Sequence, residues 1–437
     1  MKKAFLLFAL LFVSTFAFSQ NVISLFGKAS EFFNYLEAGK YDTAHLYFDE
    51  TERAKITPEN LQKLWTSVKT QLGDVEFIDP IQSKIQGEFY AVTVEGKFER
   101  DEQTFVLMFN KTEKVVGLYM PPKAIAYTKP FYVDTDLYTE SSVYLQSPGH
   151  QLAAVITVPK NVTNFPVVVL VHGSGPSDMD GTVGPNKPLK DIATGLASKG
   201  IGSVRYVKRT VIYAAEFAKA FTVKEEVIDD AVAAIALAKT VKGADLKNIY
   251  LFGHSLGGML APRIASLAPD LKGMIIAAAP ARKLTDIIVE QNKYIVAQAK
   301  DTTGQAQKYL DEALKTIEGS RITKLSPTLK ADSVIIGLPA SYWVDLNAYN
   351  QVAAAKASLK KVLIIQGGND FQVSETDFNL WKAGLAGKTN ATFKFYPEIN
   401  HLLSPQLEKG NSSQYQKMVN VAENVVKDMA AWIKEGK

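Results

Sequence analysis

Residues 253–258 read Gly253-His254-Ser255-Leu256-Gly257-Gly258 and join two segments of different character. The apolar run Ile249–Phe252 before them predicts a buried strand, and the apolar spacing from Leu256 to Leu267 predicts a helix. A serine between glycines at a strand–turn–helix junction is the G-x-S-x-G pattern of a nucleophile raised on a tight turn. Glycines are needed there because larger side chains would clash with neighbouring backbone. We therefore expect the hydroxyl of Ser255 to project from one end of a sheet.

The histidines limit the choice of a general base for this serine. The chain has five: His45, His150, His172, His254 and His401. Folds that use this turn order their triad as serine, acid and histidine along the chain, and only His401 follows Ser255. It comes just after the predicted strand Thr392–Tyr396, in a loop that would hang over the sheet edge. We expect His254 to point away from the hydroxyl and to be structural, and His45 to pack or lie on the surface.

Asp370 is the candidate acid. It follows the buried strand Val362–Ile365, and its task would be to fix the tautomer of His401 and to stabilise the imidazolium. Glu375 and Asp377 also lie between the serine and the histidine, but we expect both to be exposed on the following helix.

An oxyanion hole needs two backbone N–H groups aimed where negative charge develops. One should come from Leu256, directly after the serine. The other should come from the loop after the apolar strand Val167–Val171, where we favour the N–H of Ser174. Glycines flank Ser174 on both sides, which would let backbone approach a substrate closely. An ordinary tight turn is the alternative interpretation of that loop.

From about residue 126 to 437, apolar strands alternate with helical segments, which indicates an α/β domain with a mostly parallel sheet covered by helices on both faces. The predicted helices include Lys224–Lys239 and a final one over Tyr415–Ile433. Residues 281–350 have helical periodicity but no buried strand, and we expect them to form a helical cap over the sheet edge. Four aromatic residues of this segment either line an apolar pocket or pack the cap: Tyr294, Tyr309, Tyr342 and Trp343.

Residues 20–125 have a different pattern, with helical segments first and strands after. Alternating segments at 89–94, 104–109 and 115–120 predict three strands. Helices on one antiparallel sheet suit a small α+β domain. It offers no pair of nucleophile and base, so we assign the chemistry to the second domain.

Further motifs carry a family resemblance. They are His172-Gly173-Ser174-Gly175-Pro176-Ser177-Asp178, Gly184-Pro185-Asn186-Lys187-Pro188, Arg205-Tyr206-Val207-Lys208-Arg209 and Asn400-His401, besides the turn around Ser255. Together they resemble a group of bacterial carboxylesterases of the α/β-hydrolase superfamily, over residues 142 to 437. The resemblance implies the α/β-hydrolase fold, hydrolysis of esters with small acyl groups, and a cone-like, NTF2-like domain in front. The family usually has aspartate at position 207, so Val207 predicts that Arg205 or Arg209 lacks an ion-pair partner.

The sequence therefore predicts a serine esterase that takes a small-molecule ester and uses no cofactor or metal. Thioesterases, acyltransferases and peptidases of this fold use the same residues, and an exported binding protein with a degenerate hydrolase domain is a further alternative. The chain has no cysteine and none of the His-Glu-x-x-His or phosphate-binding glycine motifs. We expect Asp178 and Asp180 to fix a loop and not to bind a metal. A formal net charge of +4 gives no reason to expect a nucleic-acid partner. The oligomeric state is left open.

The first nineteen residues resemble an export signal. Lys2 and Lys3 precede an apolar run from Ala4 to Phe18, and Ala17-Phe18-Ser19 offers small residues where a signal peptidase cleaves. The run is shorter than the ~20 residues that span a bilayer. We expect cleavage after residue 19, no membrane anchor, and a periplasmic or extracellular protein.

Overall fold

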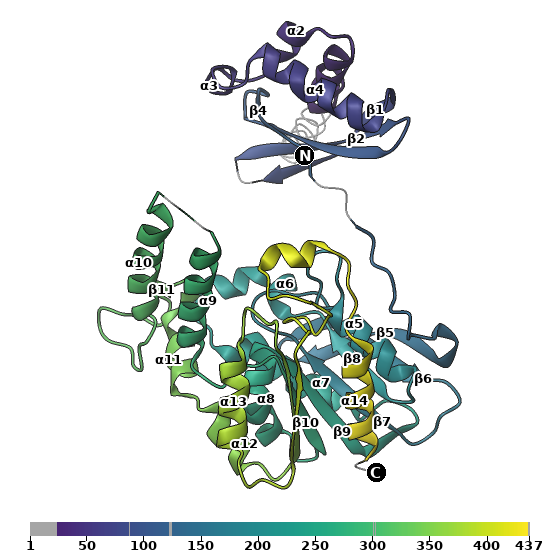
Figure 1. Ribbon diagram of the computed structural model, residues 1–437, viewed down its shortest axis with the longest axis vertical. Helices are drawn as coiled ribbons and strands as arrows, with labels where there is room; N and C mark the ends of the chain where they lie inside the picture. Colours follow the sequence, from purple (N-terminus) through teal and green to yellow (C-terminus); the bar gives the residue numbers. More distant parts are fainter. Residues whose placement is uncertain (1–23, 87, 122–124, 300, 302, 436–437) are drawn as a thin grey trace, which may run out of the picture. The chain divides into compact units, whose positions relative to one another are not determined.

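The computed structural model describes residues 24–435, except 87, 122–124, 300 and 302. The expected export signal, residues 1–19, lies outside the described residues. The chain divides into two compact units, with the boundary between Ala124 and Ile125. Each unit has hydrophobic clusters of its own (Figure 1).

The first unit packs helices on one antiparallel sheet, as the α+β prediction requires. Its helices span residues 24–37, α2 (Tyr41–His45), α3 (Glu50–Arg53) and α4 (Pro58–Leu72). Its strands are β1 (Val75–Gln86), β2 (Phe89–Phe98), β3 (Glu102–Phe109) and β4 (Val115–Tyr119), in the order β1-β2-β3-β4. The core is aromatic, with Trp65 of α4 packed against Phe98 and Phe105 of the sheet.

The strand β1 was missed by sequence reasoning. It contains Pro80, a residue that cannot donate a ladder hydrogen bond and is confined to edge strands or bulges. In the structure β1 is an edge strand, and its register with β2 shifts between Pro80 and Gln82. The shift leaves one extra residue, Ile81, in the strand, so the alternation of its side chains between the two faces is interrupted there.

The second unit is built on an eight-stranded sheet. Along the chain its strands are β5 (Tyr138–Ser147), β6 (His150–Pro159), β7 (Phe165–Val171), β8 (Gly202–Tyr206), β9 (Ala244–His254), β10 (Gly273–Ala277), β13 (Lys361–Gly367) and β14 (Ala391–Tyr396). Their order across the sheet is β14-β13-β10-β9-β7-β8-β6-β5. The pairs from β14 to β8 are parallel, and β6 joins β8 and β5 antiparallel.

Helices bury both faces of this sheet, so its central strands are almost wholly apolar. One face packs on α7 (Asp229–Ala238), α8 (Leu256–Leu267) and α13 (Glu375–Gly384). The other packs on α5 (Pro188–Ala197) and α14 (Glu423–Lys434). The predicted fold class, an α/β-hydrolase sheet behind a small α+β domain, is confirmed.

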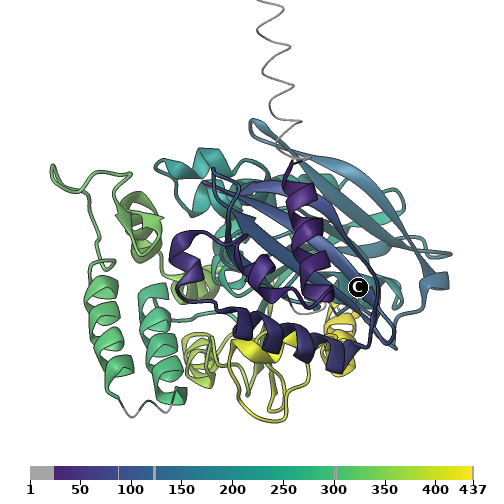
Figure 2. The ribbon, with the colours of Figure 1, turned by 90° about the horizontal axis from the view of Figure 1, so that it is seen from above.

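Residues 284–357 carry the helical segment expected as a cap. It comprises α9 (Leu284–Gln298), α10 (Gln305–Glu318), the short hairpin β11 (Val334–Ile335) and β12 (Leu338–Pro339), α11 (Ala340–Ala348) and α12 (Gln351–Ala357). The helices α9 and α10 lie side by side (Figure 2). Within the described residues, no helix is both long enough and apolar enough to cross a bilayer.

Three elements of the second unit differ from the sequence predictions. The edge strand β5 was missed because its exposed residues are mostly polar. The helix expected over Lys224–Lys239 begins with a π-helical turn, η3 (Lys224–Ile228), before α7. The final helix is shorter than expected, because a 3₁₀ turn, η4 (Ser412–Gln416), and a loop precede α14. The second unit also has the short helices η1 (Thr135–Leu137), α6 (Arg209–Ile212) and η2 (Ala214–Ala218).

Candidate active site

Ser255 occupies the turn between β9 and α8. Its φ is 53° and its ψ is −119°, a conformation that costs a non-glycine residue free energy and that clusters at functional sites. A side chain at Gly257 would overlap the backbone carbonyl oxygen of His172, so only glycine lets the turn approach the neighbouring loop. Ser255 itself is partly exposed. Among the described residues, no hydrogen bond engages its hydroxyl.

His401 and Asp370 are brought together by two loops at the end of the sheet. The Nδ1 atom of His401 lies 2.7 Å from Oδ2 of Asp370, and both side chains are buried. The other oxygen of Asp370, Oδ1, accepts backbone N–H groups of Gln372 and Val373, at 2.7 and 2.9 Å. The side-chain amide of Gln366 also donates to Oδ2, at 3.2 Å, so four donors fix the carboxylate in one orientation. It therefore holds one tautomer of the imidazole, with the proton on Nδ1 and Nε2 free to accept.

His254 ties the serine turn to the histidine loop. Its Nε2 atom donates to the carbonyl oxygen of His401 at 2.7 Å, and the two rings are 4.7 Å apart between centroids. Burial, together with the nearby His401, lowers the pKa of His254 to about 4, so the ring stays neutral near pH 7. This contact agrees with the predicted structural role of His254.

The loop His172–Gly175 lies beside the serine. A Cβ atom placed on Gly173 would be 3.2 Å from Cβ of Ser255, which puts this backbone next to the turn. Ser174 is exposed, and within the described structure its N–H has no acceptor. Leu256 is the first residue of α8, where backbone N–H groups have no partner within the helix. Both predicted donors are therefore available in the described structure.

The aromatic residues of the segment expected as a cap mostly pack. Tyr342 and Trp343 are fully buried, and their polar atoms bond Glu226 and the carbonyl oxygen of Ile335. Tyr294 stacks on Phe371, the residue after Asp370, with centroids 6.0 Å apart. Tyr309 is 62% exposed. Of the two interpretations left open, packing is the one that the contacts of Tyr342 and Trp343 support.

The expectation that Arg205 or Arg209 lacks a partner is wrong. Arg205 bonds Asp180 at 3.0 Å and Glu140 at 2.8 Å, and Arg209 forms a buried ion pair with Asp230. These three acids lie far from position 207 in the chain, and they supply the negative charge that an aspartate at position 207 would have supplied.

Three further acids hold loops in place. Asp178 accepts the backbone N–H groups of Asp180 and Thr182, at 3.1 and 3.0 Å, and Asp180 also pairs with Lys187, so the loop-fixing role predicted for Asp178 and Asp180 is confirmed. Asp377 contradicts its prediction, because it is buried and not exposed. It accepts the N–H of Ala281 at 2.9 Å and pairs with Arg282, which anchors the start of the cap.

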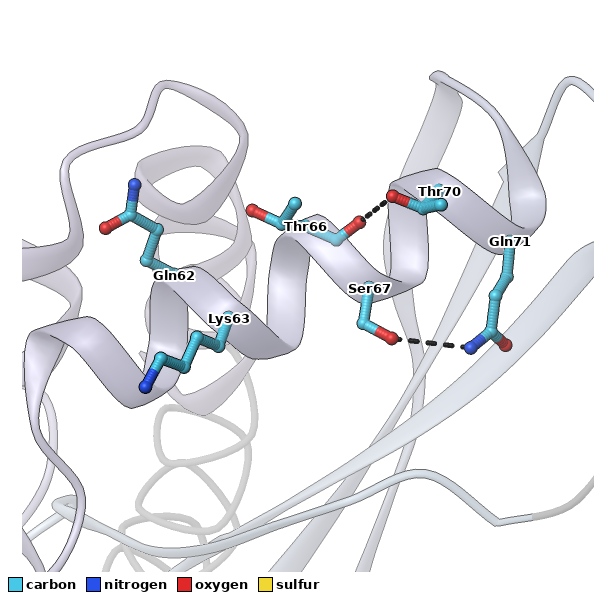
Figure 3. A pocket seen from close by; sticks show the side chains of 6 residues that line it. All are labelled: Gln62, Lys63, Thr66, Ser67, Thr70 and Gln71. Atoms are coloured by element: carbon cyan, nitrogen blue, oxygen red, sulfur yellow. Dashed lines mark hydrogen bonds between the residues drawn. The ribbon is translucent and has the colours of Figure 1, made fainter.

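The rest of the described structure offers no second catalytic site. The residues that the structure describes contain no cluster of three histidine, aspartate or glutamate side chains that could hold a metal ion. A groove in the first unit runs along α4 (Figure 3). It is lined by amides, hydroxyls and one ammonium, from Gln62, Lys63, Thr66, Ser67, Thr70 and Gln71. These groups bond along their own helix, as from Thr70 to Thr66, and provide no general base.

Two families match the chain. Residues 220–407 match the family described as "Serine aminopeptidase, S33", and residues 29–118 match "Protein of unknown function (DUF3887)". The chain is 34% identical over 403 residues to Esterase EstD of Thermotoga maritima, covering 92% of this chain and 93% of that protein.

Solved structures are more distant. Est1E from Butyrivibrio proteoclasticus is 16% identical, with a TM-score of 0.43, and the match covers 67% of this chain and 99% of that one. An acylaminoacyl peptidase from Pyrococcus horikoshii is also 16% identical, with a TM-score of 0.43 and coverage of 74% and 52%.

Proposed function

Because this chain belongs to the family of Esterase EstD, we propose that it is a serine esterase that hydrolyses small-molecule carboxylic esters through an acyl-enzyme on Ser255. The observation that carries the proposal is the buried pair of His401 and Asp370, 2.7 Å apart, with the loop of His401 tied to the turn that presents Ser255. No cofactor or metal enters the proposed reaction.

The proposed reaction has two halves. His401 accepts the hydroxyl proton of Ser255 at Nε2 while the oxygen attacks the ester carbonyl, and the resulting imidazolium is stabilised by Asp370. The N–H groups of Ser174 and Leu256 bind the oxygen that becomes negative. Collapse of the tetrahedral intermediate releases the alcohol, which takes the proton from His401. Water then attacks the acyl-enzyme while His401 takes a proton from it, and His401 returns this proton to the oxygen of Ser255 as the acid is released.

The acyl group is proposed to be short, and the leaving group an alcohol. Thioesters, acyl transfer and peptides are alternatives on the same residues, and the match to a family described as serine aminopeptidases makes amide substrates the alternative to test first. A panel of matched esters, thioesters and amides with one acyl group separates them. Esters should give the highest kcat/KM.

We further propose that the protein is exported after cleavage behind residue 19. Support comes from Lys2 and Lys3, the apolar run after them, and the small residues before the cleavage site. The mass of the secreted protein tests this, since a mature chain should begin at Gln20.

The central test replaces the nucleophile and the base separately. Ser255→Ala should abolish ester hydrolysis and labelling by a fluorophosphonate, with kcat reduced about 10⁴- to 10⁶-fold, and His401→Ala should cost nearly as much. Circular dichroism and the melting temperature should stay near those of the wild type, because a partly exposed hydroxyl contributes little to the core. The proposal would be refuted if Ser255→Ala kept a tenth of the wild-type activity, or if the wild-type protein hydrolysed no ester.

A further inference from the structure

Lys208 takes no part in the proposed reaction, yet its side chain is buried against the loop His172–Gly175, next to Ser255. Its side chain is 2% exposed, and its Nζ atom donates to the carbonyl oxygen of Gly173 at 3.0 Å and to Oε1 of Glu226 at 2.6 Å. A buried ammonium is costly unless it is paired and hydrogen-bonded. Lys208 lies in the motif Arg205–Arg209, to which the proposed reaction gives no other role.

Glu226 connects this lysine to two further groups. Its Oε1 atom also accepts the N–H of Gly175 at 3.1 Å, and its Oε2 atom accepts the hydroxyl of Tyr342 at 2.7 Å. Burial alone would raise the pKa of Glu226, but the charge of Lys208 and these hydrogen bonds outweigh it and lower the pKa, so the carboxylate is ionised. Glu226 lies in the π-helical turn η3, a distortion that occurs frequently at functional sites.

The ion pair holds the two peptide units on either side of Ser174. In the unit Gly173–Ser174, the carbonyl oxygen is fixed by Lys208. Because a trans peptide is planar, the N–H of Ser174 must point the opposite way, away from the lysine. In the next unit, the N–H of Gly175 is fixed by Glu226. The direction of the Ser174 N–H is thus set from both sides by one buried ion pair.

We infer that Lys208 and Glu226 are positioning residues of the oxyanion hole, which orient the Ser174 N–H toward the developing negative charge. Tyr342 makes this orientation depend on how α11 of the cap segment is seated, because its hydroxyl bonds the same carboxylate. The inference rests on the proposed function. Its physical basis is that oxyanion donors act only when they are oriented before the reaction, and the loss of one donor lowers kcat about 10²- to 10³-fold.

The test compares an ester with the matched thionoester, in which sulfur replaces the carbonyl oxygen. Sulfur is a weak hydrogen-bond acceptor, so thionoester turnover depends less on the oxyanion hole. Lys208→Met should lower kcat for the ester by about 10- to 100-fold with little change in KM, but lower thionoester turnover by less than about threefold. The ratio of kcat/KM for the ester to kcat/KM for the thionoester should therefore fall well below that of the wild type.

Two further variants keep the test decisive if Lys208→Met alone fails to fold. Tyr342→Phe leaves the ion pair in place and should lower the ratio by about 3- to 10-fold. The double variant Lys208→Met with Glu226→Gln leaves no unpaired buried charge and should lower the ratio as much as Lys208→Met alone.

Asp230→Asn is the matched control. It breaks the buried ion pair of Arg209, which lies in the same motif as Lys208. The side chain of Arg209 also donates to the hydroxyl of Ser147, and it has no hydrogen bond to the loop Gly173–Gly175. Asp230→Asn should lower the melting temperature while leaving the ratio as in the wild type. Equal losses on both substrates in the Lys208 and Tyr342 variants, or no loss, would overturn the inference. Ser255→Ala decides the proposed function separately, because that variant should lose turnover of both substrates.

Discussion

The Nε2 atom of His254 donates to the backbone carbonyl oxygen of His401 at 2.7 Å, so the residue before the serine holds the loop of the histidine. The loop cannot shift without breaking this bond. The turn of the candidate nucleophile is therefore linked to the loop of the candidate base by a side chain that takes no part in the proton transfers.

His254→Phe tests this relationship, since it keeps a ring and removes the donor. We expect it to destabilise the second unit by about 1–3 kcal/mol, the cost of leaving a buried carbonyl unpaired. The kcat for a short ester should fall by about tenfold because the His401 loop is less well placed. Steady-state kinetics and urea unfolding measure the two effects.

His45→Phe is the control for this variant. It breaks a similar bond, from Nε2 of His45 to the carbonyl oxygen of Arg53 at 3.1 Å, in the first unit. It should leave kcat unchanged. Wild-type kcat in His254→Phe would show that the bond does not position the loop.

The lowered pKa of His254 makes the stability of the folded protein depend on pH. An unfolded histidine titrates near 6.5, whereas burial lowers the pKa of His254 in the folded protein to about 4. Between these values the unfolded chain binds more protons, so this histidine makes stability fall as the pH is lowered from about 6.5 toward 4. His254→Phe lacks the group, so its stability deficit should shrink by about 2 kcal/mol between pH 7.5 and 5.0. Urea unfolding of both proteins at the two pH values measures this, and a constant deficit would contradict it.

The sequence could locate the segments of the candidate site because each lies at a short, recognisable junction. Ser255 stands in a glycine turn after an apolar strand, Asp370 follows another such strand, and His401 is the only histidine after the serine. The structure pairs the last two, while the roles of all three remain proposals. The fold class was predictable for the same reason, since alternating apolar strands and helices are local patterns.

What the sequence could not predict depends on contacts between distant segments. Glu226 and Lys208 are 18 positions apart in a helix and a loop, and nothing local marks the glutamate as buried. The error on Asp377 has the same origin. Its helix exposes its neighbours Glu375 and Thr376, but Arg282 and the backbone of Ala281 come from the start of the cap segment and bury the acid.

The acyl-chain preference should favour short chains. Two aromatic residues of the segment that we expect to cap the site, Tyr342 and Trp343, are fully buried, which leaves them unavailable to contact a long chain. Acetyl to butyryl esters should then show higher kcat/KM than decanoyl esters, because each methylene without a pocket forfeits up to ~0.8 kcal/mol of transfer free energy. A set of nitrophenyl esters from two to ten carbons measures the profile. Values that rise steadily with length would contradict this expectation.

Activity should persist in EDTA. The proposed reaction uses only Ser255, His401, Asp370 and two backbone N–H groups, and the described residues hold no cluster suited to a metal. Hydrolysis of a short ester is measured before and after dialysis against the chelator. Loss of activity that zinc or calcium restores would require a different mechanism.

The first unit should be dispensable for the chemistry, provided that the cut is made at its boundary. Every residue of the proposed machinery lies after His172, and the segment from Ile125 onward belongs to the second unit. The hydroxyl of Tyr127 bonds Asp191 at 2.7 Å, and that of Tyr132 bonds the carbonyl oxygen of Val421 at 2.7 Å. A fragment of residues 125–437 should therefore keep these bonds, react with a fluorophosphonate, and hydrolyse a short ester within about threefold of the full chain.

A fragment that begins at Asp134 provides the contrast. It loses Tyr127 and Tyr132, leaves the buried Asp191 with fewer donors, and opens the space that the ring of Tyr132 fills beside Gly195. We expect it to be less stable than the longer fragment by about 2–4 kcal/mol, from two lost hydrogen bonds and the unfilled space. Melting temperatures and probe labelling of the two fragments, measured side by side, separate the outcomes. If the fragment of residues 125–437 has the higher melting temperature and still fails to react with the probe, the first unit contributes directly to the active site and is not dispensable.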